Sequence, residues 1–86
     1  MHVTLLSETG CELCVHANAV LERLATEYPI DIRVVELATA EGQNLAQRGG
    51  IMFPPGLFLG DEPFSYGRVS ERRLRRALNH QLRSIR

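Results

Sequence analysis

The only two cysteines of the chain, Cys11 and Cys14, lie close together in the stretch SETGCELCVHANAVLERL. An apolar run ends just before them and a helical pattern begins at Cys11, so the pair is expected at a helix N-terminus. The unpaired N–H groups and the dipole of a helix favour a thiolate at this position, and the thiolate is the form that attacks. We therefore expect Cys11 to be an exposed nucleophile. Cys14, about one helical turn deeper, would resolve a mixed disulfide.

Two other interpretations of the pair remain open. Free cysteine buries readily, so both thiols could be core residues, although Cys11 follows a polar turn. Cys11, Cys14 and His16 could instead supply three zinc ligands, but a tetrahedral structural site needs a fourth ligand and the chain has no second CxxC. His16 is expected on a solvated helix face. Glu8 and Glu12 flank Cys11 and are also expected to be solvated, where their charge would oppose thiolate formation.

Periodicity predicts the elements that position the cysteines. Strands are expected at residues 3–6, 30–37, 57–59 and 64–66. Helices are expected from Cys11 to just before Pro29, over residues 40–48 behind an N-cap at Thr39, and after an N-cap at Ser70. The expected buried helix faces are Cys14, Ala17, Leu21, Leu24, Ala25 and Tyr28 in the first helix and Leu74, Ala77, Leu78, Leu82 and Ile85 in the last.

The order β-α-β-α-β-β-α predicts one α/β domain over residues 1–86. Its sheet would be mixed and four-stranded, with helices on both faces. The apolar fraction of 44% and the charged fraction of 23% are typical of a globular domain. The formal net charge is zero, no apolar run could span a membrane, and the N-terminus does not resemble a signal peptide. We therefore expect a cytoplasmic monomer that binds neither nucleic acid nor membrane.

Two adjacent prolines, Pro54 and Pro55, precede the predicted strand Leu57-Phe58-Leu59. Cis peptide bonds are almost confined to the bond before proline, and proline suits a strand start that donates no ladder hydrogen bond. The pattern alone leaves a cis and an all-trans loop equally open. A cis Pro55 would let the loop stand beside Cys11, where the preceding backbone could pair with a substrate peptide.

Together these features resemble the thioredoxin fold, and most closely the small glutaredoxin-like proteins of the thioredoxin superfamily. VTLLSETGCELC is similar to their opening strand and active site, and FPPGLFLGDEPFSYGRVSERRLRRAL to their proline, strand, hairpin and helix ending. The resemblance covers about residues 2–82. It implies a thiol–disulfide oxidoreductase with Cys11 as nucleophile, Cys14 as resolving thiol and Pro55 as the cis-proline.

The resemblance also implies a substrate site, with departures from the family pattern. Glu12-Leu13 replaces the Pro-Tyr of ordinary glutaredoxins, and Phe53-Pro54 replaces the usual Thr-Val. The family binds the γ-glutamyl group of glutathione with a Gly-Gly pair and an acidic helix start, which are reduced here to Gly67-Arg68 with Ser70-Glu71. The predicted substrate-binding residues are Phe53, Pro54, Pro55, Gly67, Arg68 and Ser70.

No cofactor is expected to be required, and glutathione is a possible co-substrate. The expected partner is a disulfide-containing protein or a small thiol, with glutathione or a thioredoxin reductase as electron donor. Two alternatives come from other classes. Cys11 from two chains could hold an iron–sulfur cluster, as in some glutaredoxins. The chain could also be a binding module that kept the fold without the activity.

Overall fold

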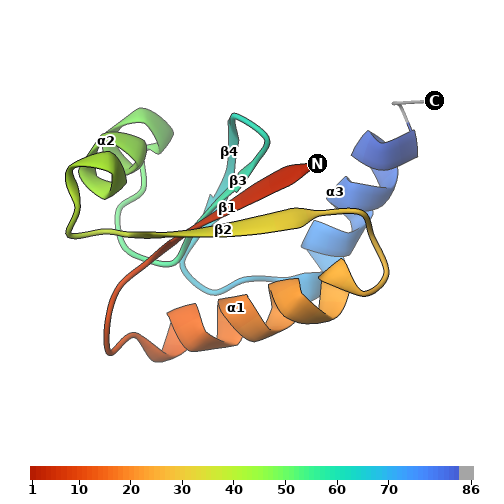
Figure 1. The fold of residues 1–86 in the computed structure, drawn as a ribbon, viewed down its shortest axis with the longest axis horizontal. Coiled ribbons are helices and arrows are strands. Elements are labelled where there is room, and N and C mark those ends of the chain that lie inside the picture. Colours follow the sequence, from red (N-terminus) through yellow and green to blue (C-terminus); the bar gives the residue numbers. More distant parts are fainter. Residues whose placement is uncertain (84–86) are drawn as a thin grey trace.

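The structure, a computed structural model, describes residues 1–83 of the chain. Its elements, in the predicted order, are β1 (His2–Ser7), α1 (Glu12–Ala25), β2 (Asp31–Glu36), α2 (Ala40–Gly49), β3 (Gly56–Leu59), β4 (Glu62–Tyr66) and α3 (Glu71–Arg83) (Figure 1). The strands form one four-stranded sheet in the order β2-β1-β3-β4. β1 is parallel to β2 and antiparallel to β3, which is antiparallel to β4. The predicted α/β class and mixed sheet are confirmed, and the architecture is that of a thioredoxin-like fold.

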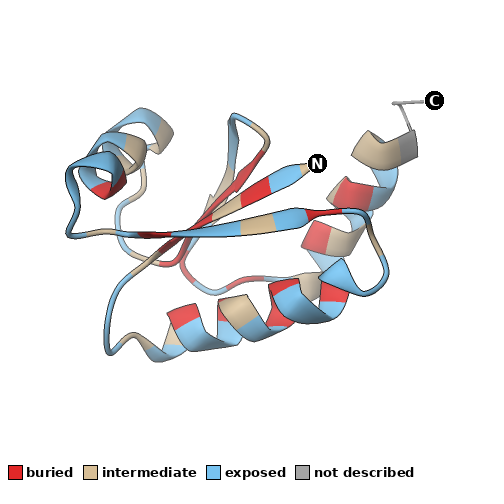
Figure 2. Ribbon diagram, viewed as in Figure 1, coloured by how far each residue is buried: buried red, intermediate tan, exposed pale blue. Residues whose placement is uncertain are grey.

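Helices cover both faces of the sheet, with α1 on one side and α2 on the other (Figure 1). The main core lies between the sheet and the helices α1 and α3. Strand side chains alternate between faces, and those in this core are Val3, Leu5, Leu57 and Leu59, packed with Ala17, Val20, Leu21, Leu24, Leu74 and Leu78. The intervening residues Leu6, Val35 and Phe58 are buried on the other face. The buried stripe of α1 faces the sheet in Figure 2.

The strand register brings three segments to one end of the sheet. Leu6, near the end of β1, pairs with Gly56 at the start of β3. The turn that carries Cys11 therefore leaves the sheet where the segment ending in Pro55 enters it. Gly56 also pairs with Tyr66 at the end of β4, so Gly67 lies at the same end. Antiparallel pairing of β3 with both neighbours thus positions the candidate site.

α1 is shorter than its sequence pattern predicts. It ends at Ala25, and the hydroxyl of its C-cap Thr26 donates to the carbonyl of Arg23 at 2.7 Å. Ala25 is exposed, although it was expected on the buried face, and Val20 is buried instead at 1% exposure. The side chain of Val20 fills the stripe between Ala17 and Leu24, which are three residues before it and four after it. The predicted core residue Ile85 lies outside the described residues.

Both ends of α2 carry capping residues that the sequence predicts. The hydroxyl of Thr39 accepts a hydrogen bond from the N–H of Gly42 at 3.0 Å, and Gly50 ends the helix with a φ of +63°. Gly42 sits against the backbone of Glu36 and Leu37, where no Cβ would fit without a shift. Across residues 1–83, no helix has the length and apolar character needed to cross a membrane.

Candidate redox site

A tight turn places Cys11 at the start of α1. The N–H of Cys11 donates to the carbonyl of Glu8 at 3.3 Å, and Gly10 within the turn has a φ of +79°. Glycine adopts this conformation without the steric penalty that a side chain would bring. The local sequence ETGC therefore folds as a turn that closes directly onto the helix.

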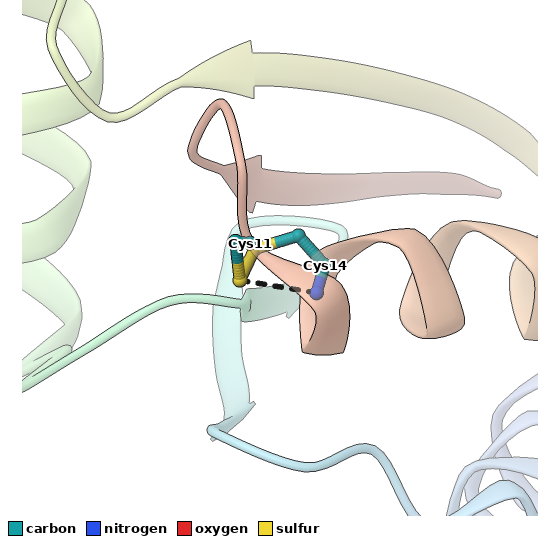
Figure 3. The surroundings of a disulfide bond; sticks show 2 residues. All are labelled: Cys11 and Cys14. Atoms are coloured by element: carbon teal, nitrogen blue, oxygen red, sulfur yellow. Dashed lines mark hydrogen bonds between the residues drawn. A yellow bond between two sulfur atoms is a disulfide. The ribbon is translucent and has the colours of Figure 1, made fainter.

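Cys11 is the N-cap residue of α1, in extended conformation with φ −97° and ψ 110°. Its Sγ accepts a hydrogen bond from the backbone N–H of Cys14 at 3.1 Å, drawn as the dashed line in Figure 3. The sulfur occupies the position that a capping hydroxyl or carboxylate oxygen usually takes. When Cys11 is reduced, this N–H and the positive end of the helix dipole would both stabilise its thiolate.

The two sulfurs are joined in a disulfide, with the two Cα atoms 5.2 Å apart (Figure 3). Their surroundings differ, because Cys11 is half-buried whereas Cys14 is buried at 3% exposure. Burial of both thiols in the core, one of the open interpretations, therefore does not hold for Cys11. Among residues 1–83, no three His, Cys, Asp or Glu side chains gather in an arrangement that could hold a metal ion.

The loop before β3 carries the second part of the site. The Pro54–Pro55 peptide is cis, as the resemblance implied. The carbonyl of Pro55 accepts a hydrogen bond from the N–H of Gly67 at 2.8 Å, which ties this loop to the end of β4. Pro54 has no N–H, so only its carbonyl could pair with the backbone of a bound peptide.

The ring of Phe53 covers Gly67. A Cβ at Gly67 would lie 2.8 Å from Cε2 of Phe53, and the φ of Gly67 is +78°. Phe53 also packs edge-to-face on Tyr66, with ring centroids 5.2 Å apart. Phe53, Tyr66 and the neighbouring Met52 are 53%, 43% and 75% exposed. We call these three side chains the apolar platform. Met52 and Tyr66 were not among the predicted site residues, because only the fold brings the loop and the hairpin together.

The remaining predicted substrate-binding residues occupy different surroundings. Phe53, Pro54, Pro55 and Gly67 come together at the Cys11 end of the sheet. Arg68 follows directly, is exposed, and forms no ion pair with any described residue. Ser70 is the N-cap of α3, because its Oγ accepts the N–H of Arg73 at 3.2 Å. The hydroxyl of Ser70 therefore already has a structural role, which the sequence also predicted.

A small hollow borders the disulfide on the side of β2. Its volume is about 260 Å³, and its lining is Leu5, Ser7, Glu8, Cys11, Cys14, Val15, Asn18 and Val34. We call it the acidic hollow, since Glu8 is its only charged lining residue. Val15 and Val34 are 71% and 53% exposed, so apolar surface is open to solvent beside the sulfurs. His16, Glu8 and Glu12 are exposed, as predicted.

Glu71, the first residue of α3, forms ion pairs with two arginines. Glu71 pairs with Arg23 of α1 at 2.6 Å and with Arg75 at 3.1 Å. These hydrogen-bonded guanidinium groups hold the pKa of the Glu71 carboxyl below its ordinary value. The carboxylate is thus committed to linking two helices. It is not a free acceptor for the amino group of a small ligand.

A thioredoxin-like fold whose first helix is capped by one cysteine of a disulfide-bonded CxxC pair defines a glutaredoxin-like protein of the thioredoxin superfamily. The comparison with known families agrees, because the family described as Glutaredoxin-like domain (DUF836) matches residues 2–79. The chain belongs to this family. Among curated proteins, the search found no match.

Proposed function

We propose that the protein is a thiol–disulfide oxidoreductase. The observation that carries the proposal is the position of the Cys11 sulfur, which caps α1, accepts the N–H of Cys14 and is bonded to the Cys14 sulfur. Family membership supports the same class of chemistry. Both sulfurs needed for a two-step exchange are therefore within bonding distance, with the more exposed one at the helix terminus.

In the proposed cycle, the Cys11 thiolate attacks one sulfur of a substrate disulfide. A bond forms between this sulfur and Cys11 Sγ, the substrate S–S bond breaks, and the other substrate sulfur leaves as a thiolate that takes up a proton. Cys14 then loses its proton and attacks Cys11 Sγ, which closes the Cys11–Cys14 disulfide and releases the second substrate thiol. The substrate gains two electrons and the protein loses them. A thiol or a reductase must restore the dithiol.

We further propose that polypeptide disulfides, rather than glutathione, are the main substrates. The Phe53 ring fills the space in front of Gly67, Glu71 is held by two arginines, and Pro54 offers no N–H. Each of these features removes a contact that the resemblance would assign to glutathione. The apolar platform instead exposes two aromatic rings in edge-to-face contact and a methionine side chain, and exposed apolar surface of this kind binds polypeptides.

Disulfide-reduction assays test the proposal, with insulin or a mixed disulfide as substrate. Wild type should turn over, and Cys11→Ser should lose activity completely because no second thiol is exposed at the helix cap. Cys14→Ser should form the first mixed disulfide and stop there. Mass spectrometry should then detect a covalent adduct with the substrate on Cys11.

Full activity in Cys11→Ser would overturn the assignment of roles. Equal turnover by Cys14→Ser with a polypeptide substrate would show that Cys14 does not resolve the intermediate. A coloured protein with visible absorbance after anaerobic purification would favour the iron–sulfur alternative. A protein that binds partners but exchanges no disulfide would favour the binding-module alternative.

A further inference from the structure

Apart from Cys11 and Cys14, the residues that line the acidic hollow take no part in the proposed disulfide exchange. One wall is apolar and consists of Leu5, Val15 and Val34. Glu8 supplies a carboxylate, and Ser7 and Asn18 supply smaller polar groups. Cys11 and Cys14 complete the lining, so a group that enters the hollow lies beside the redox pair.

The carboxylate of Glu8 has no counterion within the described part of the chain. Among the described residues, no basic side chain lies within ion-pair distance of Glu8, and no lining residue of the hollow is cationic. Glu12 and Glu36, near the same end of the sheet, likewise form no ion pair with a described residue. By contrast, Glu27, Glu41 and Glu71 each pair with an arginine. The basic Arg68 lies beyond Gly67, at the cis-proline loop, and does not line the hollow.

The turn fixes Glu8 near the nucleophile. The hydrogen bond from the N–H of Cys11 to the carbonyl of Glu8 spans a four-residue turn, whose end Cα atoms lie within about 7 Å of each other. A substrate group that binds the Glu8 carboxylate would therefore lie close to Cys11. It would also lie close to the substrate cysteine that Cys11 attacks.

The volume and the lining of the acidic hollow indicate which kind of group would fit it. A volume of about 260 Å³ falls below the roughly 300 Å³ at which small-molecule and cofactor sites begin, so one side chain fits better than a cofactor. An apolar wall beside a carboxylate matches a side chain with a long apolar stem and a cationic head, as in lysine and arginine. The two acidic neighbours at this end would disfavour an anionic partner.

We propose that the acidic hollow receives a lysine or arginine side chain of a polypeptide substrate, next to the substrate cysteine that Cys11 attacks. The stem lies against Val15 and Val34, and the cation pairs with Glu8. Glu8 is thus a specificity-determining residue for the exchange reaction. This inference rests on the proposed function and names its substrate class, a polypeptide disulfide with a basic residue beside the cysteine.

The experiment uses peptides that are identical except for the residue beside their single cysteine, which is lysine, norleucine or glutamate. Each cysteine is activated as a disulfide with 2-thiopyridine, an uncharged leaving group. Attack by Cys11 forms the Cys11–peptide disulfide and breaks the bond to thiopyridine, which leaves as absorbing thiopyridone. Each rate constant is divided by the rate constant for dithiothreitol with the same peptide, because a neighbouring lysine also speeds attack by any thiolate.

With wild type, we expect the lysine peptide to react about 5-fold faster than the norleucine peptide at low salt, and this ratio to fall as salt screens the charges. Glu8→Gln should bring the ratio close to one, and Glu8→Lys should favour the glutamate peptide. Glu12→Gln is the matched control. It removes an acid outside the lining of the hollow and should keep most of the ratio.

Equal normalised rates for lysine and norleucine peptides with wild type would overturn the inference while leaving the proposed function intact. A lysine preference that survives in Glu8→Gln would also overturn it. If no peptide reacted with the protein although all reacted with dithiothreitol, the proposed function would fall, and this inference with it. Circular dichroism of each variant would confirm that the exposed turn tolerates the change.

Discussion

Cys11 and Cys14 share one helical turn but differ in their exposure to solvent. The Cys11 sulfur caps the helix and this residue is half-buried, whereas Cys14 is buried. In the proposed cycle an incoming disulfide would therefore reach Cys11 first, and Cys14 would react within the chain. The spacing of the cysteines and the helix start were sufficient to predict the difference in exposure between them. The acidic hollow could not be predicted, because it depends on the β1–β2 register that places Leu5 beside Val34.

Phe53 offers a test of the apolar platform at the level of one side chain. Phe53→Ala should lower kcat/KM for a polypeptide disulfide by about 5-fold or more, the size of a moderate interface contact. Activity toward a small disulfide such as hydroxyethyl disulfide should change by less than about 2-fold, since it does not reach the platform. Steady-state kinetics with both substrates measures the difference.

An equal loss with both substrates would show that Phe53 supports the cis-proline loop and does not bind polypeptides. Tyr66→Phe is a suitable control, because it keeps the ring that packs edge-to-face on Phe53. We expect it to retain most of the activity with either substrate.

The elements themselves were predictable where local signals were strong. Thr39 and Ser70 were identified as N-caps, and both accept a backbone N–H in the structure. The end of α1 was predicted too late, because Pro29 is a clear stop signal whereas the back-bonding hydroxyl of Thr26 is not. The 53% exposure of Val34 has no local signal, because an apolar residue in a strand shows its surroundings only in the folded sheet.

The N-cap residue of α3, Ser70, allows a prediction about the free energy of unfolding. Ser70→Ala should lower the free energy of unfolding by about 0.5–2 kcal/mol, because the N–H of Arg73 would lose its side-chain acceptor. Urea unfolding followed by circular dichroism measures this change. Ser70→Asp, which retains an acceptor at the cap, should remain close to wild type. Equal destabilisation of both variants would contradict a capping role.

At the scale of the whole molecule, an ion-pair network joins α1 and its following turn to α3. Arg75 contacts Glu27 at 2.6 Å and Glu71 at 3.1 Å, and Glu71 contacts Arg23 at 2.6 Å. The network therefore links the two helices that pack on the main core. Residues that pair directly lie up to 48 residues apart in sequence, so no local pattern could pair them.

This network predicts how stability depends on acidity. The arginines hold the pKa values of Glu27 and Glu71 below the ordinary value of 4.5. Folded pKa values below the unfolded values mean that the stabilisation is complete above about pH 4.5 and disappears as the pH falls through the folded values. Glu71→Gln should therefore lower the melting temperature modestly at neutral pH, and the difference from wild type should shrink in acid.

Thermal unfolding from about pH 7 to about pH 3 measures this effect. Glu62→Gln is the control, because Glu62 is exposed and forms no ion pair with a described residue. A difference between wild type and Glu71→Gln that grows with acidification would reverse the sign and contradict the role of the network.

The burial of Cys14 also bears on how the protein withstands peroxide. In the reduced protein a peroxide molecule would meet the Cys11 thiolate and convert it to a sulfenic acid, while Cys14, at 3% exposure, is shielded. The shielded thiol can then displace hydroxide from the oxidised sulfur, which releases water and restores the disulfide. Irreversible damage would require a second peroxide to arrive before this step. We therefore expect oxidative injury to end in a form that any reducing thiol can repair.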